Sequence, residues 1–130
     1  LYVDWNGNIT PCVFIPYYED NVKELYRQNK KLADALFSEL FVNGRKWQRR
    51  YGLDNTKKPN NWLMPCSIRD HWINFMGEIL TKNSKPEDEH AKQALESKDY
   101  NKMLEEFDKE LSEKTEPIWK KEYLEHAGKF

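Results

Sequence analysis

The fold class follows from the first twelve residues, Leu1-Tyr2-Val3-Asp4-Trp5-Asn6-Gly7-Asn8-Ile9-Thr10-Pro11-Cys12. Leu1, Val3 and Trp5 alternate with polar positions, as in a half-buried strand. Asn6-Gly7 offers the pair of positive φ angles that a type I′ turn needs. We therefore expect a β-hairpin over residues 1–15, whose second strand ends near Pro11 because proline cannot donate to a ladder.

Helical spacing dominates the next part of the chain, although residues 17–31 fit a short strand or a helical turn equally well. A helix over about residues 31–51, ended by Gly52, is predicted by apolar residues three and four positions apart. These residues are Leu32, Ala35, Leu36, Leu40 and Trp47. The polar residues 53–62 predict a surface loop. Pro65-Cys66-Ser67 then opens a second helix with Ser67 as its cap. The apolar face of that helix comprises Ile68, Trp72, Phe75 and Ile79.

The composition changes beyond Thr81, where residues 82–86 resemble a linker and Glu, Lys, Leu and Ala then dominate. A helical tail is expected, kinked or restarted at Pro117. Its narrow apolar stripe comprises Met103, Phe107, Leu111, Ile118 and Trp119. The predicted fold class is α+β: a small sheet led by a β-hairpin and packed by helices, followed by the helical tail. We expect an accessory domain over residues 1–80 and a helical C-terminal extension over residues 81–130.

Aromatic residues are concentrated in the first part of the chain, so the core is expected within the first 80 residues. Its predicted members are Trp5, Leu36, Leu40, Trp47, Trp72 and Phe75.

The charge balance excludes some partners. The chain has 21 basic and 22 acidic residues and a formal net charge of -1, which calls for neither nucleic acid nor an anionic membrane. No signal-peptide pattern is present. Two cysteines are too few for a disulfide framework. We expect a cytoplasmic protein in a reducing environment.

The glycine-four-residue-cysteine spacing of Gly7 and Cys12, on the strand leaving a tight turn, resembles the C-terminal auxiliary-cluster region of radical S-adenosylmethionine (SAM) enzymes, the SPASM or twitch type. The resemblance continues through Asn21-Val22-Lys23-Glu24-Leu25, the helix beginning Leu32-Ala33-Asp34-Ala35-Leu36, and Arg45. Asp20 replaces the glycine that precedes the asparagine in that family. Cys66 occupies the place of a further family cysteine.

The resemblance implies that Cys12 and Cys66 are metal ligands of a [4Fe-4S] auxiliary cluster. The first cysteine of the family motif would lie upstream of Leu1, so we expect a piece of a longer oxidoreductase that is not catalytic alone. S-adenosylmethionine would bind to an N-terminal radical SAM barrel of the same polypeptide. That barrel is the expected partner, together with a peptide or small-molecule substrate.

Other interpretations of these residues remain. Both cysteines can be small buried hydrophobes. The basic and aromatic residues 45–51 could bind single-stranded nucleic acid, but a helix C-terminus also favours cations. Cys66 and His71 could pair on zinc, although no third or fourth ligand has suitable spacing. Asp70-His71 beside Ser67 contains the residue types of a catalytic triad, but adjacent helical residues point apart. The functional alternative is a non-catalytic helical protein-interaction module.

Overall fold

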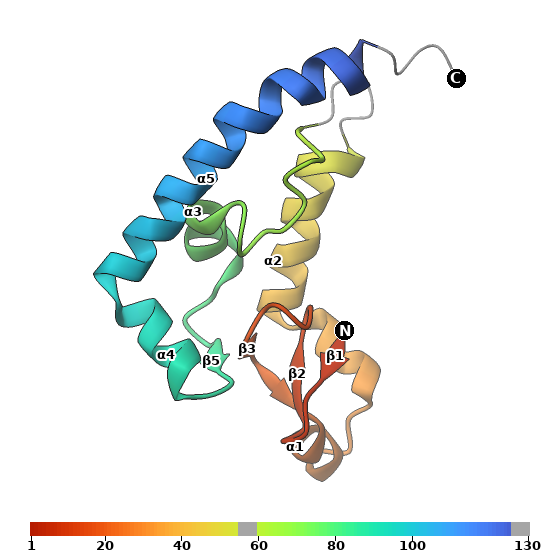
Figure 1. Ribbon diagram of the computed structural model, residues 1–130. Coiled ribbons are helices and arrows are strands. Elements are labelled where there is room, and N and C mark those ends of the chain that lie inside the picture. Colours follow the sequence, from red (N-terminus) through yellow and green to blue (C-terminus); the bar gives the residue numbers. More distant parts are fainter. Residues whose placement is uncertain (55–59, 126–130) are drawn as a thin grey trace.

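The chain folds into a small α+β structure, described by a computed structural model for residues 1–54 and 60–125 (Figure 1). A three-stranded antiparallel sheet has the order β1-β2-β4. Its strands are β1 (Tyr2–Val3), β2 (Asn8–Thr10) and β4 (Asp20–Asn21). Tyr2 pairs with Thr10 and Ile9 pairs with Asp20, so β2 lies in the middle. The predicted hairpin is confirmed, and its second strand ends directly before Pro11.

The hairpin turn differs from the predicted type. Gly7 has a φ of 87°, but Asn6 is not among the described residues with a positive φ, so the turn is not type I′. The Gly7 N–H donates to the Asp4 carbonyl at 3.0 Å. This arrangement matches the three-residue hairpin loop in which a tight turn is followed by a left-handed glycine. The buried Asp4 carboxylate accepts the N–H of Asn8 at 2.8 Å and thereby closes the loop.

A second, two-stranded sheet joins distant parts of the sequence. β3 (Tyr17–Tyr18) pairs antiparallel with β5 (Lys85–Pro86), and Tyr17 is opposite Pro86. The predicted linker 82–86 is therefore partly a strand. The short strand β5 tolerates Pro86 because a residue in an edge strand need not donate a hydrogen bond to the ladder.

The predicted helix over residues 31–51 is broken at Ser38. It consists of the 3₁₀ helix η1 (Leu32–Phe37), α2 (Glu39–Gln48) and the π-helical η2 (Arg49–Leu53). Ser38 is extended, with a ψ of 155°, and the N–H of Leu40 donates to a Glu19 carboxylate oxygen at 3.1 Å. The helix also continues through Gly52, so that glycine does not end it. Residues 55–59 of the predicted loop lie outside the described residues.

Two shorter helical segments precede and follow α2 in the sequence. α1 (Val22–Arg27) follows β4 directly, and the Asn21 side chain accepts the N–H of Lys23 at its start. α3 (Trp72–Asn74) continues into the π-helical η3 (Phe75–Ile79). Ser67 is not its cap, because residues 67–69 form a turn and the helix begins only after His71.

The tail is helical, as predicted, throughout its described part. It comprises α4 (Glu89–Glu96), α5 (Lys98–Ile118) and the π-helical η4 (Trp119–Leu124). Asp88 and Ser97 cap α4 and α5 by accepting backbone N–H groups. Pro117 is the second-last residue of α5, which changes to η4 after Ile118. α3 lies between α2 and α5, so the tail packs alongside the first part of the chain (Figure 1).

The main core joins both halves of the sequence. Leu40, Trp47, Trp72 and Phe75 are buried as predicted, and Leu36 is half-buried. The tail contributes Ala91 to the same cluster, with Leu95 and Leu104 packed against it. Trp5 is 85% exposed, so its placement in the core is wrong. It lies in the hairpin loop, where strand alternation no longer applies.

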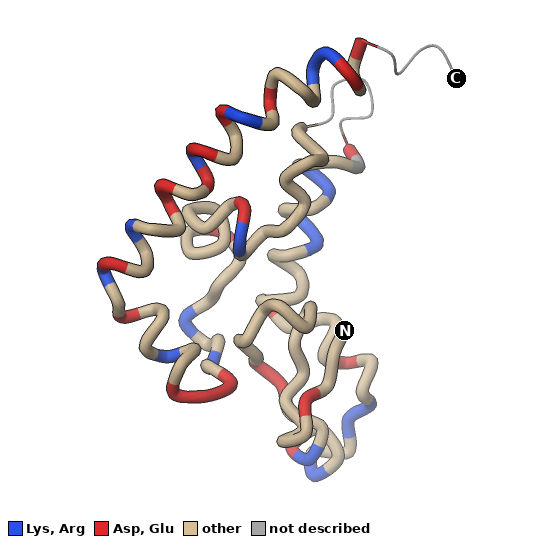
Figure 2. The backbone as a smooth tube through the Cα atoms, in the orientation of Figure 1, with Lys and Arg blue, Asp and Glu red and all other residues tan. Residues whose placement is uncertain are grey.

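Charges of both signs alternate along α5, and no long single-sign run follows that helix (Figure 2). Within residues 1–54 and 60–125, no helix combines the length and apolarity needed to cross a bilayer.

Candidate functional site

Cys12 lies on the exposed segment that follows β2. Its carbonyl accepts two hydrogen bonds, one from the Ile15 N–H at 3.0 Å and one from the Thr10 hydroxyl at 3.1 Å. Because Thr10 and Ile15 are both buried, these bonds hold the backbone of Cys12 against the sheet while its side chain faces outward.

Cys66 is half-buried at the start of a tight turn. The Asp70 N–H donates to the Cys66 carbonyl at 2.8 Å, and the Cys66 N–H donates to the Asp70 carboxylate at 3.0 Å. Asp70 is fully buried. The two reciprocal bonds fix the position of Cys66 relative to the core.

Arg69 lies beside Cys66 and forms a two-pronged ion pair with Asp70. The Nη2 to Oδ2 distance is 2.9 Å. The pKa of Arg69 is raised, chiefly by the hydrogen bond to Asp70 and to a smaller extent by Cys66. Arginine has five N–H donors, of which Asp70 takes two, so donors remain for another group.

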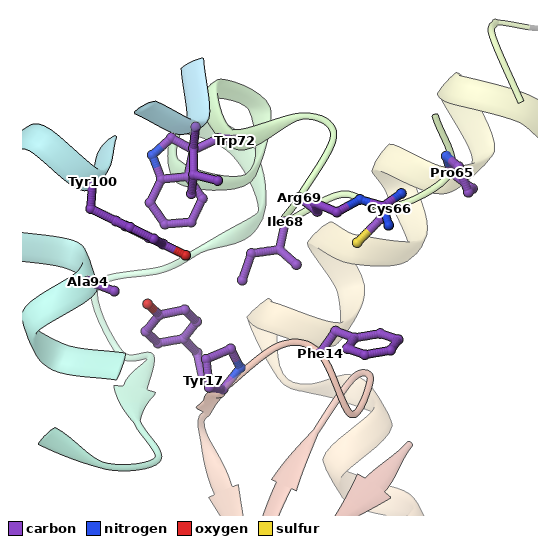
Figure 3. A pocket seen from close by; sticks show the side chains of 11 residues that line it. Phe14, Tyr17, Pro65, Cys66, Ile68, Arg69, Trp72, Ala94 and Tyr100 are labelled. Carbon is purple, nitrogen blue, oxygen red and sulfur yellow. The ribbon is translucent and has the colours of Figure 1, made fainter. Parts of the chain in front are cut away.

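A cavity of about 520 Å³ lies between the segment that follows Cys12 and the helical tail. Its lining residues are Phe14, Pro16, Tyr17, Pro65, Cys66, Ile68, Arg69, Trp72, Ala94, Tyr100 and Leu104. Figure 3 shows Phe14 facing Cys66 at one end and Trp72 and Tyr100 at the other. Phe14 is only two residues after Cys12, a reach of at most about 7 Å along the chain. The two cysteine-bearing segments therefore adjoin the same cavity.

The aromatic floor of this cavity is held rigidly. The Tyr17 hydroxyl donates to the Ala91 carbonyl at 3.0 Å, and the Trp72 indole N–H donates to Asn101 Oδ1 at 2.7 Å. Burial raises the pKa of Tyr17 to about 12, so its hydroxyl stays protonated at neutral pH. Each polar tip thus has its own protein partner, and ring surface lines the cavity.

The structure does not form the zinc pair or the triad that the sequence suggested as possibilities. His71 Nε2 lies 2.8 Å from the Met64 carbonyl, and its ring packs against Trp47 and Tyr51. Asp70 is bonded instead to Arg69 and Cys66. Within residues 1–54 and 60–125, no three His, Cys, Asp or Glu side chains are grouped to hold a metal ion.

The basic stretch 45–51 has its aromatic residues packed on each other. Trp47 is 5% exposed and stacks on Tyr51 with ring centroids 4.8 Å apart. Arg50 is paired with Glu78, and Arg49 with Asp54. Trp47 is therefore a core residue and has no free face for a nucleic-acid base.

The donor chemistry of the two thiols fits part of an iron–sulfur site. Such clusters are usually held by four cysteine thiolates, and this chain contains Cys12 and Cys66. These residues can supply two ligands, and the others would come from outside the chain.

Sequence reasoning missed the cavity and most of its lining. Phe14 and Tyr17 belong to the apolar run after Cys12, which is a visible signal, but Ala94, Tyr100 and Leu104 reach the site only because the tail folds back. Comparisons of this chain with protein-family models, with curated proteins and with solved structures give no match.

Proposed function

We propose that this chain is an accessory iron–sulfur domain of a radical SAM oxidoreductase and that Cys12 and Cys66 are two ligands of its auxiliary [4Fe-4S] cluster. The observation that carries this proposal is that Phe14, two residues after Cys12, lines the same cavity as Cys66. The hairpin with Gly7 in its turn, which the family resemblance requires, supports it further.

The remaining ligands and the catalytic barrel lie elsewhere in the polypeptide under this proposal. The barrel would bind its own [4Fe-4S] cluster and S-adenosylmethionine, and the auxiliary cluster would pass electrons or hold a peptide or small-molecule substrate. The residues of this chain would provide the thiolates and a rigid support for them. Free cysteines and an iron–sulfur cluster both favour the reducing cytoplasm.

The proposal is tested by anaerobic reconstitution of the whole polypeptide with iron and sulfide. Replacing Cys12 or Cys66 by serine should reduce the bound iron and the visible sulfide-to-iron absorption by about one cluster's share, because serine is a poor ligand for this cluster. Ser67→Ala, next to Cys66, is the matched control and should keep the full iron content. Unchanged iron in both cysteine variants would refute the proposal.

A second test needs only this chain. Dibromobimane becomes fluorescent when both of its arms have reacted, so it reports thiols that approach each other. We expect the native chain to give an intramolecular fluorescent adduct and the single variants Cys12→Ser and Cys66→Ser to give none. Labelling of each thiol without cross-linking would place the sulfur atoms too far apart to share a cluster.

The alternative function is a non-catalytic helical protein-interaction module. The observation in its favour is that Met103 is 54% exposed and Phe107 is 40% exposed on α5. Iron content discriminates between the two functions: a colourless whole protein after reconstitution favours the module. In that case, Phe107→Glu should abolish capture of a partner, whereas Cys12→Ser should not affect it.

A further inference from the structure

We propose that the cavity bounded by Phe14, Arg69, Trp72 and Tyr100 is a binding site for a small organic acid with a flat apolar ring. This inference is independent of the cluster, because it rests on the walls of the cavity and not on thiolate ligation. It assigns a ligand class to a site that both halves of the chain build.

The size of the cavity suits such a ligand. Its volume of about 520 Å³ falls within the usual range for small-molecule pockets, roughly 300–1,000 Å³. Tyr17 and Trp72 form a floor that is 1% and 2% exposed, so it is already packed before a ligand enters. Tyr100 stands edge-on to Trp72, with ring centroids 6.0 Å apart and an interplanar angle of 83°. A preformed floor lowers the ordering cost of binding.

The apolar character of the ligand follows from the hydrogen bonds of the floor. The Tyr17 hydroxyl and the Trp72 indole N–H are used by Ala91 and Asn101. Pro16, Ile68 and Leu104 add aliphatic surface. Phe14 and Tyr100 are the aromatic lining residues with exposed ring surface, at 72% and 39%. An apolar ring bound here exchanges water for contacts with that surface, whereas a polar body would lose hydrogen bonds that the walls cannot replace.

The acidic group of the ligand follows from Arg69. It is the charged member of the described lining, and its side chain is 59% exposed while held in place by Asp70. Figure 3 places Arg69 and Cys66 at one end of the cavity and Trp72, Tyr100 and Ala94 at the other. A carboxylate at the Arg69 end would accept hydrogen bonds from N–H groups that Asp70 does not use, while the ring lies toward the Tyr100 end of the cavity.

The test uses indole-3-acetate as the probe and its uncharged analogue indole-3-acetamide, with the native 130-residue chain and no added iron. Titrations followed by amide chemical shifts should show changes confined to the lining residues. The acetate should bind about tenfold more tightly than the acetamide, as expected for one charge-assisted hydrogen bond. Equal affinities would overturn the assignment of an acid, and shifts elsewhere in the chain would overturn the site.

Two variants of α4 distinguish binding inside the cavity from non-specific binding to an exposed apolar side chain. Ala94→Phe fills the cavity from its wall and should weaken indole-3-acetate binding at least about tenfold. Gln93→Phe adds the same ring at an exposed neighbouring position outside the lining, and it should bind like the native chain. Equal binding by the Ala94→Phe variant would overturn the proposal.

Alkylation rates of the two thiols report ligand binding in the protein without any substitution. Cys66 lines the cavity, whereas Cys12 is exposed and outside the lining. Saturating indole-3-acetate should slow iodoacetamide labelling of Cys66 several-fold and leave Cys12 unchanged, measured by peptide mass spectrometry. Equal slowing of both thiols, or of neither, would contradict binding in the cavity. Since no iron is present, this result is separate from the fate of the cluster proposal.

Discussion

Trp47 of α2 stacks on Tyr51 of its continuation η2, and both rings pack against the ring of His71. Trp47→Ala should lower the free energy of unfolding by about 3–5 kcal/mol, the usual cost of removing a buried tryptophan. Urea denaturation followed by circular dichroism measures it.

Trp5 is the matched control for this prediction, because it is 85% exposed. Trp5→Ala should change the unfolding free energy by less than about 0.5 kcal/mol. Equal midpoints for the two variants would mean that Trp47 contributes no core packing.

A second residue-scale prediction concerns the carboxyl pair of Asp4 and Glu87. Burial raises the pKa of Glu87, and its hydrogen bond to Asp4 raises it further. Burial of Asp4 acts in the same direction, but hydrogen bonds from Asn8 outweigh it and hold the pKa of Asp4 below its usual value. The ionised form of Glu87 is therefore disfavoured in the fold. Glu87→Gln should raise stability at neutral pH by well under about 1 kcal/mol, because solvent screens the group and the amide still donates to Asp4.

The pH dependence gives the sign of that effect. A raised folded pKa means that stability is greatest when Glu87 is protonated and declines as the pH rises through the folded pKa. The advantage of Glu87→Gln should consequently shrink toward about pH 4, measured by thermal unfolding across pH. Glu89→Gln, at an exposed position that pairs with Lys92, is the control and should not stabilise the chain. A pH-independent gain for Glu87→Gln would contradict this account.

Among the elements, α3 and α5 are joined by Asp108. Its carboxylate on α5 accepts the N–H of Trp72 at 2.6 Å, where α3 begins without a side-chain cap of its own. Burial raises the pKa of Asp108, although the Trp72 N–H and nearby His71 act in the opposite direction. Asp108→Ala should cost about 1–3 kcal/mol because it leaves a half-buried N–H without its acceptor.

Asp108→Asn shows whether the hydrogen-bond acceptor or the negative charge of Asp108 determines its contribution to stability. It keeps an oxygen for Trp72 and avoids burying an ionised group, so it should be clearly more stable than Asp108→Ala at neutral pH. Glu106→Ala, on the exposed side of α5, should cost less than about 0.5 kcal/mol. Chemical denaturation of the three variants decides the point. Equal losses for Ala and Asn at position 108 would show that the hydrogen bond contributes nothing.

The same elements show what can be predicted from the sequence. The hairpin and the helical tail were predictable because Gly7 and the periodic apolar residues of the tail act locally. The break at Ser38 carried a local signal, a serine before a glutamate, but the acceptor of the Leu40 N–H is Glu19 from another segment. β5 exists because β3 pairs with it, and α3 is capped from α5. Local patterns do not contain these long-range partners.

Some residues of the candidate site could likewise be predicted from the sequence, whereas others could not. Cys12 could be singled out from its spacing to Gly7, and Cys66 from its place after the helices, but their relation to one cavity depends on tertiary packing. Arg69 carried no signal, because its role arises from the buried Asp70 beside it. Tyr100 and Ala94 belong to a segment that the sequence separates from the first 80 residues. A site built by two halves of a chain cannot be recognised from either half alone.

Considered as a whole, the molecule has one main core to which the tail contributes. Ala91 is 5% exposed within that core. Trp119 of η4 packs on Trp62 of the first part, with ring centroids 5.7 Å apart. Trp72 donates its backbone N–H to Asp108 and its indole N–H to Asn101, both on α5. Isolated helices are marginal in water, so α5 also needs this contact for its own stability.

A chain ending at residue 80 should therefore fail to fold. It would lose β5, the cover of Trp72 and Tyr17, and the acceptor at the start of α3, and the remaining 80 residues would keep a smaller core than most independent domains of that length. Loss of near-ultraviolet circular dichroism and of amide shift dispersion is the expected result. A chain ending at residue 125 is the control and should keep both signals. A dispersed spectrum from residues 1–80 would instead support the division into two units that the composition suggested, and the tail would then be an added helix pair whose contacts stabilise a domain already able to fold.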